Sequence, residues 1–246
     1  MKWHWVLFCS AMVSTAAELP AENTGIAAPL TVSQILEMDD YDDPAVKRPG
    51  NPEVIPEKND SGLLARSGLG VYRTLDLVKI PLRRMVYRLP QKPHSWFTTG
   101  LRIQSFGRLE RNSSSLSFHF SEAKQQFELK IIHDAKSNQL ICVFLDNGKK
   151  LNEIFVPYRT LPADFQFSAA ADGSVQLYVK GVNSARPERI RSKAVFFAGL
   201  NGKPFETTLH FRNEYRHDRI AETVIDNYMT GLAAENNRTG RGRIIF

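Results

Sequence analysis

Short runs in which apolar and polar residues alternate dominate the chain from about residue 70 to 212. In segment 115–121, Leu116, Phe118 and Phe120 fall on one face, and Ser117 and His119 fall on the other. This period of two is typical of a strand that buries one face. Comparable strand-like runs occupy residues 99–106, 126–132, 139–145, 153–158, 165–169, 174–182, 193–199 and 206–212.

Three turn sequences separate neighbouring runs and predict hairpins. They are Asp146-Asn147-Gly148, Ala171-Asp172-Gly173 and Asn201-Gly202. Asn-Gly and Asp-Gly suit tight turns, because both residue types tolerate a positive φ. Many short strands joined in this way indicate a mainly β fold, which we predict to be a two-sheet antiparallel jelly-roll sandwich over residues 63–213.

After residue 213 the apolar spacing changes. Apolar residues recur there at intervals of about four, which is typical of an amphipathic helix. These residues are Ile220, Val224, Ile225, Tyr228, Met229 and Leu232. We therefore predict a C-terminal amphipathic helix over 214–234, followed by a basic disordered tail over 235–246.

The chain begins with a pattern typical of a secretory signal peptide. Lys2 precedes roughly nine mostly apolar residues, and Thr15 with Ala17 supplies the small side chains that a signal peptidase prefers. A membrane-spanning helix needs about 20 apolar residues, and no stretch of the chain reaches that length. We predict a signal peptide over 1–17 and a secreted, extracellular product without a transmembrane segment, with an uncleaved N-terminal anchor as the alternative.

Charge divides the remainder into an acidic segment and a basic body. Residues 18–62 hold ten acidic and three basic side chains and few aromatic ones. Such a composition buries too little apolar surface to offset ordering, so we predict an acidic disordered tail over 18–62 with at most a turn or two of helix near Ser33. Residues 63–246 hold 28 basic and 16 acidic side chains. This excess favours a polyanionic partner, although solubility alone also accounts for a net charge.

Two basic clusters are the candidate binding residues. The first basic cluster comprises Lys79, Arg83, Arg84 and Arg88, and the second basic cluster comprises Arg186, Arg189, Arg191 and Lys193. Clustered cations neutralise sulfates or carboxylates and release counterions, as happens when heparin-type chains or nucleic acid bind. For a secreted protein we expect a glycosaminoglycan rather than nucleic acid. This expectation requires both clusters to converge into one patch.

No pattern of a metal, cofactor or catalytic site is evident, so none is predicted. The chain has no HExxH, CxxC, GxSxG or phosphate-binding loop, and the body lacks the alternating acids of a jelly-roll glycosidase. Cys142 lies in an alternating run and is expected in the core. His119 and His210 lie in strand runs and are candidates to face each other across a sheet. Predicted glycosylation sites are the sequons at Asn59, Asn112 and Asn237.

The order of these parts resembles a known extracellular family. Leu75-Asp76-Leu77, then the run 95–105, then the hairpin from Phe167 to Val179 resemble the laminin-G-like domain of the thrombospondin N-terminal type. The similarity covers about residues 70–212. It implies a concanavalin-like sandwich that serves adhesion or glycosaminoglycan binding without catalysis. Asp164-Phe165 stands where the family has Trp-His, and the family's disulfide has no second cysteine here.

From these observations we expect a secreted, non-enzymatic binding or adhesion module of the extracellular matrix. Its expected partner is a glycosaminoglycan or another polyanion, and an extracellular protein is a further candidate. Two alternatives stay open at this point. One is a lectin-like enzyme that acts on glycans, and the other is a structural secreted protein that assembles through the helix 214–234.

Overall fold

The computed structural model describes most of the body and one short piece of the acidic segment. The described residues are 30–41, 62–66, 69–75, 79–106, 114–184, 186–213 and 220–234, of which 31, 62–66, 73–75, 79–83, 213, 220 and 221 are described by backbone alone. The predicted signal peptide, the basic tail 235–246 and the sequons at Asn59, Asn112 and Asn237 lie outside the described residues. They stay predictions.

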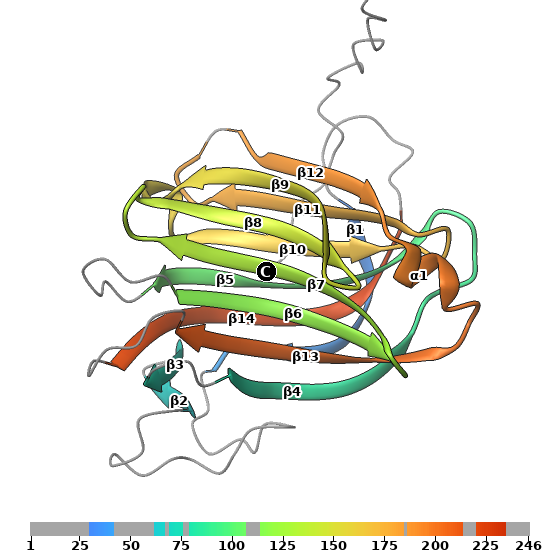
Figure 1. The fold of residues 1–246 in the computed structure, drawn as a ribbon, viewed down its shortest axis with the longest axis horizontal. Coiled ribbons are helices and arrows are strands. Elements are labelled where there is room, and N and C mark those ends of the chain that lie inside the picture. The colour runs from blue at the N-terminus through green and yellow to red at the C-terminus, as the bar shows by residue number, and fades with distance from the viewer. Residues whose placement is uncertain are drawn as a thin grey trace, which may run out of the picture.

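Two antiparallel sheets face each other and confirm the predicted two-sheet, mainly β architecture (Figure 1). Sheet A runs in the order β12 (Glu188–Lys193), β11 (Ser174–Gly181), β10 (Ala163–Ala169), β5 (Ser95–Phe106), β14 (Ile220–Ala234), β3 (Leu69–Leu75) and β2 (Gly62–Arg66), and β1 (Thr31–Asp39) also pairs with β14. Sheet B runs in the order β4 (Lys79–Arg88), β13 (Pro204–Asn213), β6 (Ser114–Glu122), β7 (Gln125–Asp134), β8 (Gln139–Asp146) and β9 (Lys149–Pro157).

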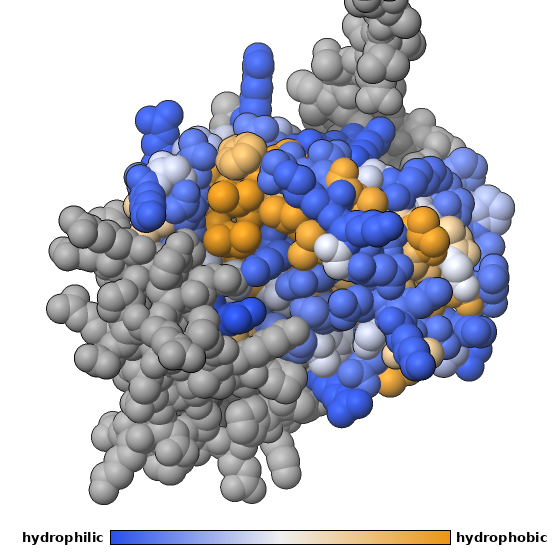
Figure 2. Space-filling model, in the orientation of Figure 1, coloured by the Kyte–Doolittle hydropathy of each residue, from blue (hydrophilic) through white to orange (hydrophobic). Residues whose placement is uncertain are grey.

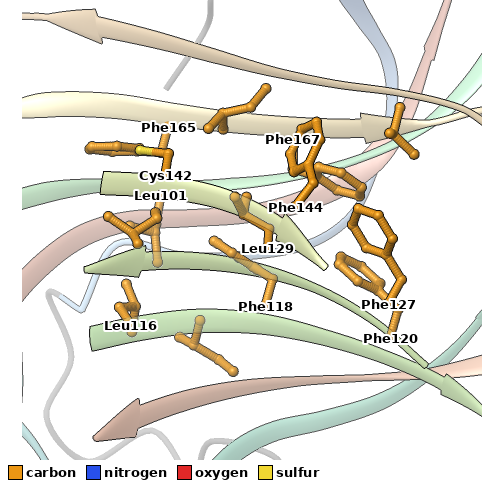
Figure 3. Close-up of a cluster of buried hydrophobic side chains, with 14 of the residues drawn as sticks. Leu101, Leu116, Phe118, Phe120, Phe127, Leu129, Cys142, Phe144, Phe165 and Phe167 are labelled. Atoms are coloured by element: carbon orange, nitrogen blue, oxygen red, sulfur yellow. The ribbon is translucent and has the colours of Figure 1, made fainter. Parts of the chain in front are cut away.

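Phenylalanine rings fill the space between the sheets (Figure 3). The Phe120 ring of sheet B lies 5.0 Å from the Phe167 ring of sheet A, and the Phe127 ring lies 5.4 Å from the Phe167 ring. Cys142 is a buried free thiol in this core, as the alternation around it predicts. Burial in these apolar surroundings raises the pKa of the Cys142 thiol to about 12, which keeps the thiol protonated and unreactive.

Two of the three predicted hairpins form as expected. Asn147 and Gly148 join β8 to β9 with φ values of 49° and 78°, and both positive values fit a type I′ turn. Gly173 joins β10 to β11 with φ of 83°. Added atoms at this glycine would meet the Ala194 carbonyl oxygen at 2.7 Å, so space as well as backbone conformation favours glycine.

The third predicted hairpin is wrong, because the run before Asn201-Gly202 is not a strand. Residues Val195–Gly199 form the short helix α1 at one end of the sandwich (Figure 1). The Asp146 carboxylate of β8 accepts hydrogen bonds from the backbone N–H groups of Val195 (2.5 Å) and Phe196 (3.3 Å). A distant side chain therefore satisfies the first donors of α1, which no local sequence pattern announces. A second short helix, η1 (Tyr158–Thr160), follows β9.

The predicted helix 214–234 is also wrong, because Ile220–Ala234 is the longest strand of sheet A. This strand lies between β5 on one side and β3 and β1 on the other. A register shift between Asp226 and Met229 inserts one extra residue opposite β5, and Asn227 adopts a φ of 49°. The bulge interrupts the period of two, so the apolar spacing imitates a helix.

The acidic segment 18–62 is not tail throughout, because Thr31–Asp39 forms β1. This strand pairs with β14 from Thr31↔Ala234 to Asp39↔Tyr228, with two register shifts. Tyr41 follows β1 and is fully buried in the core. The rest of the segment, residues 18–29 and 42–61, lies outside the described residues. The predicted short helix near Ser33 is replaced by a strand because β14 offers its open edge.

We predict that Gly231→Ala detaches β1. A Cβ at Gly231 would collide with the Gln34 carbonyl oxygen of β1, so the two backbones must separate. The expected result is faster amide exchange across residues 31–39, measured by hydrogen–deuterium exchange, and a loss of about 1–3 kcal/mol in the free energy of unfolding. Gly199→Ala is the control, since its added atom would meet nothing closer than 3.7 Å. Unchanged exchange in 31–39 would contradict the pairing.

Candidate functional site

The outer face of sheet A, over β5, β10, β11 and β12, carries polar side chains in adjacent rows. Strand alternation places the residues between the buried core positions on this face. We call the resulting surface the polar face, and its members are Thr98, Arg102, Asp164, Gln166, Ser168, Gln176, Tyr178, Arg189 and Arg191. Hydrogen bonds link some of its members across neighbouring strands, namely Arg102 with Asp164, Thr98 with Gln166 and Ser168, and Gln176 with Arg189.

A buried polar row crosses the centre of the polar face. Thr98 Oγ1 donates to the Phe167 carbonyl oxygen (3.0 Å), and it accepts from Gln166 Nε2 (3.1 Å) and Ser168 Oγ (3.1 Å). The Thr98 hydroxyl is then fully used. Gln166 is only 3% exposed, and its Oε1 has no hydrogen-bond partner within the described part of the chain. The row therefore keeps one acceptor oriented by its neighbours.

The second basic cluster places three cations in a line along the polar face. Arg189, Arg191 and Lys193 occupy alternate positions of β12, opposite Tyr178, Gln176 and Ser174 of β11. Alternate residues of a strand lie about 7 Å apart. These side chains therefore repeat at a spacing that suits the charged groups of an extended chain.

The three cations differ in the hydrogen-bond and ion-pair partners that neighbouring side chains offer them. Arg189 Nη2 donates to the neutral Gln176 Oε1 at 2.6 Å, and Lys193 Nζ lies 2.5 Å from Asp172 Oδ2. Arg191 is exposed, and no ion pair of its side chain is found within the described ranges. Among these residues Lys193 therefore has a carboxylate partner, whereas Arg189 and Arg191 have none.

A pocket of about 480 Å³ adjoins one end of the polar face. Its walls come from the segment before β5 and from the β10–β11 turn, and its lining includes His94, Trp96, Asp172 and Ser174. Trp96 is half-buried, and its Nε1 has no hydrogen-bond partner within the described residues. The pocket therefore has an aromatic side chain in its wall, whereas the indole N–H of that side chain is itself buried.

The other end of the polar face holds an ion pair. Arg102 Nε donates to Asp164 Oδ1 at 2.7 Å, and this hydrogen bond raises the pKa of Arg102. Asp226 of β14, the register partner of Arg102 on its other side, accepts from Gln104 Nε2 at 3.2 Å. Arg102 thus separates the Asp164 and Asp226 carboxylates, and each carboxylate accepts a hydrogen bond. These contacts fix this end of the face.

The structure does not bring the two basic clusters into one patch, so that expectation is wrong. The first basic cluster lies on β4, at one edge of sheet B, whereas β12 contacts β9 at the opposite edge of that sheet. Figure 1 shows β4 and β12 on opposite sides of the sandwich. Arg84 Nε also lies 2.7 Å from Glu206 Oε2. Arg88 is exposed on β4, Arg186 is exposed just before β12, and the side chains of Lys79 and Arg83 are not described.

Sequence reasoning missed the polar rows and the pocket beside the second basic cluster. Their signal is present, since Asp164, Gln166 and Ser168 alternate with three core residues in one run. Solvation of an outer face explains such a pattern equally well, so it does not mark a site without the pairing of β10 with β5. Within the described residues, no group of three or more acidic, histidine or cysteine side chains could hold a metal ion. No helix there is long and apolar enough to cross a membrane.

Comparison with known proteins shows the fold. No protein-family profile and no curated protein matches the chain. It is similar to the CBM2 module of the evolved Dit of Lactobacillus casei BL23 phage J-1, at 10% identity and a TM-score of 0.53, over 85% of this chain and 100% of that one. It is also similar to winged bean acidic lectin complexed with methyl-α-D-galactose, at 6% identity and a TM-score of 0.54, over 81% of this chain and 98% of the lectin.

A third similar structure is a mutant of the GH43 protein BlXynB from Bacillus licheniformis. The identity is 14% and the TM-score 0.51, and the match covers 80% of this chain but only 39% of that protein. The chain has a lectin-like β-sandwich fold. This agrees with the concanavalin-like sandwich expected from the sequence, whereas the laminin-G type in particular stays a prediction. At these identities the likenesses carry the fold and nothing more.

We predict that Lys193→Met raises the pKa of Asp172. The hydrogen bond from Lys193 is the largest cause that lowers this pKa to about 2. Without it, the pKa should rise toward the ordinary aspartate value of about 3.9. Because the folded-state pKa is lowered, stabilisation by the pair is present above about pH 4 and is lost as the pH falls toward 2. Both side chains are more than half exposed, so that stabilisation is small.

Carboxylate NMR titration of Asp172 measures this change. Lys180→Met is the matched control, because Lys180 lies on the neighbouring strand β11 and is not among the causes that shift the Asp172 pKa. An Asp172 pKa that stays near 2 in the Lys193 variant would show that Lys193 is not held by Asp172.

Proposed function

We propose that this protein is a secreted, non-enzymatic carbohydrate-binding module that holds an acidic glycan on the polar face of sheet A. The observation that carries the proposal is that three features lie together on one surface. They are the cation row of β12, the buried polar row around Gln166, and the pocket that contains Trp96. Each feature matches one chemical property of an acidic sugar chain.

Charged groups of the glycan would meet β12. Sulfates and carboxylates accept paired hydrogen bonds from the planar guanidinium, which favours arginine over lysine at such contacts. None of the described carboxylates pairs with Arg189 or Arg191, which leaves both guanidinium groups for such contacts. The proposal therefore keeps the second basic cluster as the glycosaminoglycan contact, and it assigns Arg189 and Arg191 the main part. The first basic cluster, on the far edge of sheet B, lies away from this contact.

Uncharged parts of the sugar would meet the rest of the face. A sugar ring offers hydroxyl groups at its rim and C–H groups on its flat sides, so it suits polar side chains beside an aromatic ring. The Trp96 side chain in the pocket wall supplies the aromatic surface, and Ser174 and Asp172 beside it supply polar groups for hydroxyls. The winged bean lectin that shares the fold is complexed with methyl-α-D-galactose, which is compatible with a glycan partner.

The carboxylates of the polar face support binding of a glycan without its hydrolysis. Glycoside hydrolysis needs one carboxyl group that stays protonated to act as an acid, together with a second carboxylate nearby. Arg102 Nε lies 2.7 Å from Asp164 Oδ1, so this carboxylate of the polar face is already engaged in an ion pair. Assembly through a C-terminal helix, the other alternative, loses its basis because residues 220–234 form the strand β14.

We predict that removing the charges of Arg189 and Arg191 weakens heparin binding far more than removing an equal charge elsewhere. The double variant Arg189→Gln/Arg191→Gln should lose at least about tenfold in affinity, since each charge-assisted hydrogen bond is worth roughly 1.5–3 kcal/mol. Arg84→Gln/Arg88→Gln on β4 is the matched control. Isothermal titration with heparin at fixed ionic strength measures both. Equal losses in the two variants would reduce the interaction to net charge.

We also predict that Trp96 reports binding directly. Trp96 is the only tryptophan after residue 17, because the others are Trp3 and Trp5. Saturation with a heparin oligosaccharide long enough to reach the pocket should shift the tryptophan emission of the chain that begins at residue 18. Trp96→Phe should abolish the signal and weaken binding by calorimetry. Emission that is unchanged at saturation would remove the pocket from the site.

A further inference from the structure

The outer face of sheet B carries a second cluster of charged and polar side chains. Neighbouring strands supply them, with His119 on β6, Glu128 and Lys130 on β7, and His210 and Arg212 on β13. Together with Ser115 and Ser117, most of these side chains line a pocket of about 100 Å³. The pocket belongs to the opposite sheet from the polar face, and none of its residues takes part in the proposed glycan site.

Two histidines stack beside this pocket, as the sequence suggested. The His119 and His210 ring centroids are 4.3 Å apart with 35° between the ring planes. His119 Nε2 lies 3.1 Å from Glu128 Oε1. Burial acts to raise the pKa of Glu128 and is the largest single influence, but His119, Ser117 and Lys130 together lower the pKa to about 2. Glu128 is therefore ionised at neutral pH and is held by His119.

Among the described residues that line the pocket, positive charge exceeds negative charge. Glu128 is the only carboxylate among them, whereas Lys130 and Arg212 are both cationic. The Arg212 Nε atom is buried, and it has no hydrogen-bond partner among the described residues. A buried guanidinium N–H is a strong donor that requires an acceptor. The lining adds the hydroxyl groups of Ser115 and Ser117 as further donors from a second strand.

We propose that this pocket binds a tetrahedral oxyanion, the sulfate or phosphate group. Donors converge on it from β6, β7 and β13, which suits an anion that accepts hydrogen bonds in several directions. The small volume admits such a group and excludes a sugar ring or a nucleotide. The anion would accept hydrogen bonds from Arg212, Lys130, His210 and the serine hydroxyl groups. Glu128 would remain paired with His119.

The same sheet face also carries apolar side chains, which begin beside the pocket, where Ile132 is the register partner of Ser115, and continue toward β9. Ile132, Ile141 and Phe155 are register neighbours across β7, β8 and β9, and Phe155 is 55% exposed. Figure 2 shows apolar side chains gathered within an otherwise hydrophilic surface on the side viewed in Figure 1. The charged pocket therefore lies on a face of mixed character and not on a uniformly basic one, which favours a local anion site over diffuse capture of a polymer.

The test is a titration of the chain from residue 18 with sodium sulfate, and in a second arm with sodium phosphate, at constant ionic strength adjusted with chloride. Sulfate is the cleaner probe of the two, because its own charge is constant between pH 5 and 8. We expect saturable shifts of the His119 and His210 ring resonances by NMR as sulfate is added. Ring resonances that respond to sulfate no more than to chloride would overturn the proposal.

Variants separate this pocket from the polar face. Arg212→Gln should weaken sulfate binding by about tenfold. Arg191→Gln on sheet A is the matched control and should leave sulfate binding unchanged. Because the ring shifts are read in the unaltered chain, the test holds even if a variant fails to fold. An Arg212→Gln protein that is folded and binds sulfate as well as the unaltered chain would refute the assignment.

Discussion

Packing of phenylalanine rings between the two sheets is the constraint on which the rest of the structure depends. Phe120 and Phe127 of sheet B meet Phe167 of sheet A, and Phe197 of α1 closes the cluster, 5.0 Å from the Phe127 ring. Close packing of such large side chains tolerates little displacement. Since alternate residues of a strand point to opposite sides, fixing the inward residues also fixes the outward ones. Both candidate sites are therefore set by the core.

Local chemistry made part of this fold predictable. Period-two alternation marked most of the strands, and Asn147-Gly148 marked a turn, because each depends only on residues close in sequence. The misjudged segments depend on distant partners. β14 imitates a helix because a bulge at Asn227 disturbs its alternation, and α1 starts where Asp146, about 50 residues earlier, caps it. β1 forms because β14 offers hydrogen bonds that the acidic segment cannot supply for itself.

The candidate site divides in the same way. The sequence indicated the cations of β12, because Arg189, Arg191 and Lys193 are close neighbours in the chain. It could not show that the first basic cluster lies at the other edge of the sandwich, or that Gln166 and Thr98 meet. Strand order decides both facts, and strand order is a long-range property. Runs of basic residues are thus a guide to single strands and a poor guide to surfaces.

The pairing of β1 with β14 has a consequence for any shortened form of the protein. A chain cleaved after residue 41 would lose a strand of sheet A, and the backbone of β14 from Tyr228 to Ala234 would lose its neighbour on that side. An uncovered strand edge readily accepts an equivalent segment from another molecule. Such a cleavage would thereby convert the sandwich into a species prone to strand exchange, with Tyr41 removed from the core as well.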